Sequence, residues 1–146
     1  MDPLSVVFPG TWKLIRRTDC NREGERRAEP SLGEYPVALL FYDRAGNFAA
    51  QFMKRDRSGP ISDAVASGLN NSRAQGGYDA YFGTYTIDDA EKTVTQRLVG
   101  ALSRENVGMV VTRKMLVQGD ILTIKLETTS AEGEVVIRTL IWSRVS

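Results

Sequence analysis

Residues 109–142 read MVVTRKMLVQGDILTIKLETTSAEGEVVIRTLIW, and this stretch decides the fold class. It contains three runs rich in β-branched residues, Met109–Val117, Ile121–Leu126 and Glu134–Trp142, which short groups of turn-forming residues separate. Connections this short join neighbouring antiparallel strands, whereas parallel pairing requires a crossover of about a dozen residues or more. The stretch therefore predicts consecutive β-hairpins.

The same pattern continues towards the N-terminus, where Asp43–Asn47 predicts another hairpin turn. The further strands that we expect are Thr11–Thr18, Val37–Tyr42, Phe48–Lys54, Tyr81–Ile87 and Thr93–Leu98. About eight strands are the number at which an up-and-down sheet closes into a barrel that just holds one small ligand. We predict one all-β domain over residues 1–146, an antiparallel up-and-down β-barrel of about eight strands with a short N-terminal helical turn.

Two segments interrupt the strands. Asp19–Pro36 contains arginines beside glutamates, which is typical of a solvated loop, although a lid that contacts ligand fits the same sequence. Arg55–Ala80 is a long insertion, in which Ser62 predicts the N-cap of a short helix over Asp63–Leu69. An insertion of this length indicates either a flap over the barrel mouth or packing at one barrel end.

Composition excludes several classes of partner. A formal net charge of +1, from 19 basic and 18 acidic residues, gives no global field to attract nucleic acid or an anionic membrane. No apolar run approaches the roughly 20 residues that span a bilayer, and the N-terminal residues do not resemble a signal peptide. Cys20 is the single cysteine, which favours a reducing compartment. We expect a cytoplasmic protein, either a monomer or a homodimer.

The sequence contains no histidine, and this excludes whole reaction classes. Histidine is the commonest metal ligand and the side chain that titrates nearest to neutral pH. Zinc sites of the histidine type and Ser-His-Asp hydrolysis cannot be assembled from this chain. An acid–base catalyst would have to be Tyr, Asp, Glu, Lys or the one Cys. We therefore predict neither a metal site nor a cofactor.

Several stretches resemble a known family. Gly10-Thr11-Trp12 looks like the start of a lipocalin, in which the tryptophan closes one barrel end. The chain is also similar to the lipocalin-like domain family of bacterial and fungal proteins at residues 40–51 (LFYDRAGNFAAQ), 81–85 (YFGTY), 118–122 (QGDIL) and 140–142 (LIW). Two positions depart from that family: Ala45 replaces the usual Asp of the hairpin, and Gln96 stands where His is frequent. The resemblance implies a barrel that binds small molecules, and some such barrels are cofactor-free cyclases or isomerases.

Strand alternation selects candidate catalytic residues. Tyr81, Gly83 and Tyr85 share one face of their strand, which we take as the inner one, and Gly83 fits a close approach of a bulky group or another backbone. Gln96 lies among apolar neighbours and needs a hydrogen-bond partner if it is buried, either a ligand oxygen or a residue such as Tyr85. We predict Tyr81, Tyr85 and Gln96 as catalytic, although both tyrosines also fit a purely structural role in the core.

The same alternation selects ligand-binding residues. Arg113 lies on one face with Met115, so it either points into the pocket with a partner or lies at the surface. If Arg144 covers the ring of Trp12, then Arg138 and Trp142 face inward. Residues 48–54 are apolar on both faces, and periodicity cannot choose between them. The predicted ligand-binding residues are Gln51, Met53, Tyr78, Arg113, Met115, Arg138 and Trp142.

These features support two functions of different class. The leading hypothesis is a cofactor-independent cyclase or isomerase of natural-product metabolism, which folds an apolar substrate inside the barrel and polarises it with tyrosine and amide groups. The alternative is a carrier or sensor that binds a hydrophobic metabolite without chemistry. A third possibility is a barrel filled by its own side chains. Polar groups that converge on a cavity would favour catalysis.

Overall fold

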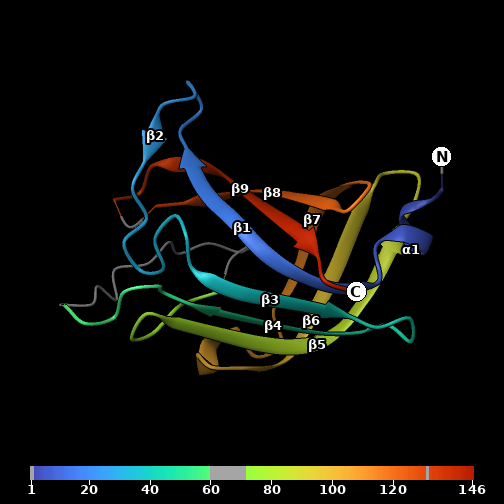
Figure 1. Ribbon diagram of the computed structural model, residues 1–146. Coiled ribbons are helices and arrows are strands. Elements are labelled where there is room, and N and C mark those ends of the chain that lie inside the picture. Colours follow the sequence, from blue (N-terminus) through green and yellow to red (C-terminus); the bar gives the residue numbers. More distant parts are fainter. Residues whose placement is uncertain (1, 60–71, 131) are drawn as a thin grey trace.

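The computed structural model describes residues 2–59, 72–130 and 132–146, which form an antiparallel β-barrel (Figure 1). The strands follow the order β2-β1-β3-β4-β5-β6-β7-β8-β9, and an additional pairing of β1 with β9 closes the sheet. Their bounds are Gly10–Cys20 (β1), Arg26–Arg27 (β2), Val37–Tyr42 (β3), Asn47–Met53 (β4), Tyr78–Asp88 (β5), Thr93–Ala101 (β6), Val110–Gln118 (β7), Ile121–Thr129 (β8) and Val135–Arg144 (β9).

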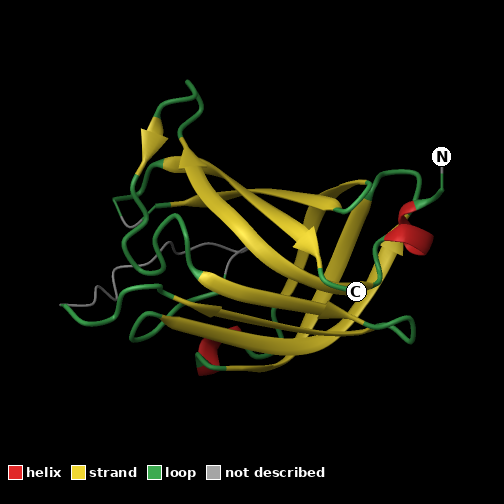
Figure 2. Cartoon of the chain, viewed as in Figure 1, coloured by secondary structure: helices red, strands yellow, loops and turns green. Residues whose placement is uncertain are grey.

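The eight long strands each pair with their sequence neighbours, and β2 adds only two residues beside the end of β1. Within the described residues, helix is confined to α1 (Leu4–Val7) and the 3-10 turn η1 (Arg104–Asn106), which Figure 2 draws in red. The predicted all-β, eight-stranded up-and-down barrel with a short N-terminal helical turn is therefore confirmed.

The seam between β1 and β9 contains an irregularity that changes which side chains enter the barrel. Pairing runs from Trp12 with Arg144 to Cys20 with Ile137, and the register shifts between Leu14 and Arg16. Before the shift, Trp12 and Leu14 are buried; after it, Arg17 is buried in place of Arg16. An extra residue in one strand of a pair breaks its alternation in this way.

The barrel end beside α1 is closed by aromatic and cationic groups. The Trp12 indole donates a hydrogen bond from Nε1 to the carbonyl of Phe8 at 3.0 Å. The guanidinium carbon of Arg144 lies 4.2 Å from the centroid of the Trp12 ring, and its nitrogens donate to the carbonyls of Val7 and Pro9. The cation–π contact contributes about 1 kcal/mol at a partly desolvated site. The predicted cover of Trp12 by Arg144 is confirmed.

Aromatic rings fill the barrel interior next to this end. Phe8 lies 4.2 Å from Tyr42 between ring centroids, and Tyr42 lies 5.1 Å from Tyr85. Phe48 also stacks on Tyr42, with 5.7 Å between ring centroids. Ring pairs at these distances contribute roughly 1 kcal/mol each beyond the area that they bury. This half of the barrel is therefore a packed core.

Gly83 allows β5 and β6 to approach each other. A Cβ atom at this position would lie 1.8 Å from the carbonyl oxygen of Arg97. The strand register also shifts between Phe82 and Gly83. The predicted close approach at Gly83 is thus an approach of backbone.

Residues 60–71 lie outside the described residues, and with them the predicted helix over Asp63–Leu69 and its cap Ser62. The described flanks of that insertion reach the barrel end that is remote from α1 (Figure 1). There Ala74 is buried, and the backbone N–H of Lys54 donates to the carbonyl of Gly77 at 2.7 Å.

Candidate functional site

Charged side chains line the inner wall of the barrel at the end remote from α1. The buried ones on the strands are Arg17 and Asp19 on β1, Asp79 on β5, Arg113 on β7 and Arg138 on β9. Alternation along each strand turns them inward. An isolated buried charge is strongly unfavourable, so the partners of these groups determine what the site can do.

Arg138 and Asp19 form a bidentate ion pair. Nε of Arg138 lies 2.8 Å from Oδ1 of Asp19, and Nη2 lies 2.9 Å from Oδ2. The two side chains are 2% and 5% exposed. Parallel charge-assisted hydrogen bonds of this kind fix the orientation of both groups.

Arg17 pairs with Glu29, which comes from the loop between β2 and β3. Nη1 of Arg17 lies 2.8 Å from Oε1 of Glu29, and Glu29 also accepts hydrogen bonds from the hydroxyl and the backbone N–H of Ser31. Burial alone would raise the pKa of Glu29, but the charge of Arg17 and the Ser31 hydrogen bonds lower it to about 2. Glu29 and Ser31 therefore pack against the barrel, whereas residues 22–28 of the same segment are exposed, as expected of a solvated loop.

Asp79 is also a buried carboxyl, but its negative charge is less well compensated than those of Asp19 and Glu29. Its Oδ2 accepts a hydrogen bond from the Ser72 hydroxyl at 2.5 Å. Burial raises the pKa of Asp79 to about 6, although the Ser72 hydrogen bond and the positive charges of Arg17 and Arg113 act in the opposite direction. A carboxyl with such a pKa exchanges a proton near neutral pH.

Tyr81 and Arg113 are both buried near Asp79. Burial raises the pKa of the Tyr81 hydroxyl, and the positive charge of Arg113 partly offsets this increase. Burial lowers the pKa of Arg113, and the nearby phenols of Tyr81 and Tyr42 partly offset this decrease. At neutral pH the site therefore presents a neutral hydroxyl and a guanidinium cation.

These groups surround a cavity of about 30 Å³. Since one water requires roughly 10–15 Å³ of such volume, the cavity has space for about two waters. The lining residues are Arg17, Glu29, Ser31, Leu32, Phe52, Ser72, Ala74, Asp79, Tyr81, Arg113, Arg138 and Leu140. The cavity is thus a small chamber lined by both charged and apolar side chains.

Of the three predicted catalytic residues, Tyr81 lines the cavity. Tyr85 donates its hydroxyl proton to the carbonyl of Asp43, in the hairpin near α1. Gln96 donates from Nε2 to the hydroxyl of Tyr42, so its partner is Tyr42 and not Tyr85. Its Oε1 atom has no hydrogen-bond partner among the described residues. Neither Tyr85 nor Gln96 is among the described residues that line the cavity.

Among the predicted ligand-binding residues, Arg113 and Arg138 line the cavity. Both side chains are buried, so Arg113 does not lie at the surface. Met115 and Trp142 also point inward and are 2% and 0% exposed, but they belong to the packed core. Trp142 contacts Phe52 at 5.7 Å between ring centroids, and its Nε1 has no partner among the described residues.

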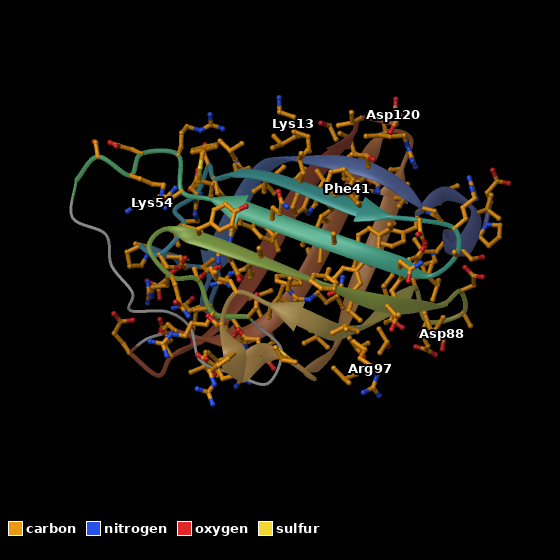
Figure 3. The ribbon with its side chains drawn as sticks, turned by 90° about the horizontal axis from the view of Figure 1, so that it is seen from below. Lys13, Phe41, Lys54, Asp88, Arg97 and Asp120 are labelled. Atoms are coloured by element: carbon orange, nitrogen blue, oxygen red, sulfur yellow. The ribbon has the colours of Figure 1, made fainter. Side chains whose placement is uncertain are left out.

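The other three predicted ligand-binding residues face away from the cavity. On β4, Phe48, Ala50 and Phe52 are buried, which places Gln51 and Met53 on the outer face. Gln51, Met53 and Tyr78 line a separate hollow of about 190 Å³ on the outside of the barrel. Figure 3 shows this side, with Phe41 on the outer face of the neighbouring β3. The sequence left open which face of residues 48–54 points inward. Phe48 and Phe52 occupy the inner face of β4, so Gln51 and Met53 do not face the interior.

Sequence reasoning missed three charged residues of the cavity. Asp79 lies two positions before Tyr81, so alternation from Tyr81 could have found it. Arg17 was hidden by the irregularity in β1, which reverses the alternation from Trp12. Glu29 comes from a loop, where no periodic pattern indicates which side chain is buried.

The described residues offer neither a group of metal ligands nor a helix that could span a membrane. Among residues 2–59, 72–130 and 132–146, no three His, Cys, Asp or Glu side chains are grouped as metal ligands. In the same part of the chain, no helix has the length and apolar character to cross a membrane.

Comparison with known proteins agrees with this architecture. Curated proteins give no match to the chain. A family model described as a lipocalin-like domain matches residues 9–145, which include all the barrel strands and every described residue of the cavity lining. A barrel of this kind suits the binding of a small molecule. The chain therefore belongs to the lipocalin-like domain family.

Proposed function

We propose that the protein is a cofactor-independent isomerase or cyclase that acts on a largely apolar small molecule at the cavity of Asp79, Tyr81 and Arg113. One observation supports this proposal above the others. A buried carboxyl with a pKa of about 6 faces the same cavity as a neutral phenol and guanidinium groups. General acid–base catalysis is most efficient when the catalytic pKa lies near the operating pH.

The chemistry needs only groups that this chain supplies. The Asp79 carboxylate removes a proton from a carbon next to a substrate carbonyl, and Tyr81 and Arg113 stabilise the negative charge that develops on the carbonyl oxygen. The proton on Asp79 then returns to a different carbon of the same molecule. This sequence moves a double bond, and it balances without an oxidant or a metal.

The apolar wall supports binding of a hydrophobic substrate. The apolar wall consists of the lining residues Leu32, Phe52, Ala74 and Leu140. Because the cavity of about 30 Å³ holds only about two waters, a substrate must displace some of the lining side chains. Holding the reacting atoms in one geometry would then supply several kcal/mol of the barrier.

A carrier or sensor of a hydrophobic metabolite is the second candidate. The observation that favours it is the same apolar wall beside guanidinium groups, which orient a ligand without chemical change. In either case we propose a cytoplasmic protein that acts as a monomer or homodimer.

Turnover distinguishes the two functions. The protein is incubated with a panel of polyene and polyketide intermediates, and isomeric products are sought by liquid chromatography and mass spectrometry. Asp79→Asn and Tyr81→Phe should abolish or strongly reduce product formation. Asp120→Asn and Tyr35→Phe make the same two substitutions at exposed side chains and should leave product formation unchanged. Product formed equally by Asp79→Asn would exclude the proposed catalytic base.

A further inference from the structure

The carboxylates around the cavity are held in two different ways. Asp19 and Glu29 each form an ion pair with an arginine, at 2.8 Å in both cases. Asp79 accepts instead a hydrogen bond from the neutral hydroxyl of Ser72. Asp79 is therefore the carboxylate here whose charge is least well compensated, as the opposite pKa shifts of Glu29 and Asp79 also indicate.

The guanidinium groups come from three strands and meet at the same chamber. Arg17 on β1, Arg113 on β7 and Arg138 on β9 all contribute to its lining. Planar guanidinium groups are the side chains best suited to a carboxylate, which they bind through pairs of hydrogen bonds. With Asp79 protonated, the three guanidinium cations exceed the carboxylates of Asp19 and Glu29 by one charge, so the chamber is then electrostatically adapted to one anionic oxygen group.

We propose, on the basis of the function proposed above, that the ligand is an amphipathic carboxylic acid whose carboxylate binds beside Arg113 and Arg17, and that Asp79 takes up one proton from solvent when it binds. Two carboxylates in a chamber of about 30 Å³ cannot both stay ionised, because like charges at such distances strongly disfavour each other. Protonated Asp79 can donate a hydrogen bond to the incoming carboxylate. For such a ligand the two proton transfers proposed above run in the reverse order: Asp79 first gives its proton to one carbon, and the carboxylate so formed removes a proton from another carbon. The aliphatic part of the ligand packs against the wall of Leu32, Phe52 and Leu140.

The sign of the pH dependence follows from the groups that face Asp79. The charged and titratable side chains around it are Arg17 and Asp19 on β1, Glu29 in the loop, Tyr81 on β5, Arg113 on β7 and Arg138 on β9. Arginines remain charged at neutral pH, Tyr81 remains neutral, and Glu29 remains ionised. The pKa of Asp79 is about 6, so affinity for a carboxylate should fall as the pH rises from 6 to 8.

Calorimetry with two ligands of equal chain length tests the inference. Octanoate and octanol are titrated into the intact protein at pH 6, 7 and 8, in phosphate and in Tris, which differ in their heats of ionisation. We expect octanoate to bind at least tenfold more tightly than octanol and its affinity to fall by about fiftyfold from pH 6 to pH 8. The difference between buffers should report uptake of close to one proton at pH 7.

Variants assign these effects to residues. Asp79→Asn should still bind octanoate, without proton uptake and with no dependence on pH. Arg113→Gln should lose the preference for octanoate over octanol. Arg97→Gln is the matched control, because its side chain points away from the barrel (Figure 3), and it should behave as wild type. If Arg113→Gln does not fold, wild type and Asp79→Asn still decide the question.

Three results would overturn the inference: no binding of octanoate at pH 6, equal binding of octanol, or unchanged proton uptake in Asp79→Asn. These results are independent of the catalytic proposal. Preferential octanoate binding without turnover of any candidate substrate would leave the carboxylate site standing and remove the catalytic function. Turnover of a substrate together with equal affinities for octanol and octanoate would leave the catalytic function standing and remove the carboxylate site.

Discussion

Arg138 and Asp19 face each other across the seam that closes the barrel, although 119 positions separate them in the chain. Their Cα atoms are register partners on β9 and β1, and their side chains form two parallel hydrogen bonds inside the barrel. The pair therefore joins the first and last strands of the barrel. It also fixes Arg138 at the edge of the cavity.

Breaking the ion pair of Arg138 and Asp19 should lower the free energy of unfolding. Asp19→Asn leaves Arg138 as an insufficiently compensated buried cation, which costs about 3 kcal/mol in comparable buried pairs. Urea denaturation should therefore show a clearly lower free energy of unfolding. The double variant Asp19→Leu/Arg138→Met removes both charges and should recover more than half of that loss, because apolar replacements of a buried pair are often close to neutral. Equal stability of Asp19→Asn and wild type would contradict this account.

Glu29→Gln should also lower the stability, by about 3 kcal/mol, because it leaves the buried guanidinium of Arg17 without its carboxylate. Glu134→Gln is the control, since its ion pair with Arg27 is half exposed, and such surface pairs contribute little. Guanidinium chloride would screen both pairs, so urea is the suitable denaturant. Equal effects of the two substitutions would show that burial is not what gives the Glu29 pair its importance.

The stability of the protein should depend on pH through Asp79. Its folded-state pKa of about 6 lies above the ordinary value of 3.8, so the fold favours the protonated carboxyl. The corresponding stability is fully present below pH 3.8 and is lost as the pH rises through 6. Since a tenfold change in an equilibrium constant is about 1.4 kcal/mol, the difference amounts to about 3 kcal/mol.

Asp79→Asn should remove this dependence and stabilise the protein at pH 7. Urea unfolding at pH 7 and at pH 5 measures both effects. Wild type should be the more stable at pH 5, whereas the variant should show little change over this interval. A variant that is less stable than wild type at pH 7 would mean that the ionised carboxylate contributes favourably to the fold. Glu29 has the opposite sign, because its lowered pKa removes stability only as the pH falls from 4.5 towards 2.

Gly83→Ala should destabilise the barrel by roughly 1–3 kcal/mol, the usual cost of forcing atoms into a packed site. The added Cβ would lie 1.8 Å from the carbonyl oxygen of Arg97, so β5 and β6 would have to separate locally. Gly59→Ala is the comparison, because nothing lies within 4 Å of a Cβ built there. Thermal unfolding of both variants, followed by circular dichroism, checks this difference. A Gly83→Ala variant that unfolds at the wild-type temperature would refute the close backbone approach.

The sequence by itself determined the barrel and much of its interior. Alternation with a period of two is a local property, so the inward position of Tyr81 and Tyr85 followed from short-range pattern, and the cover of Trp12 by Arg144, with Arg138 facing inward, followed from family resemblance. The sequence left open whether Arg113 points into the pocket or lies at the surface, and only its burial decided this. Residues 48–54 have apolar side chains on both faces of the strand, so alternation does not show which face points inward. Only the packing of Phe48 and Phe52 inside the barrel placed Gln51 outside.

The tertiary structure decided the composition of the charged cavity. A register shift in β1 turned Arg17 inward, closure of the barrel brought Asp19 to Arg138, and a loop carried Glu29 to Arg17. Each of these depends on contacts between distant parts of the chain, which local periodicity does not contain. The raised pKa of Asp79 has the same origin. It is set by burial among groups from several strands and does not follow from the residue type.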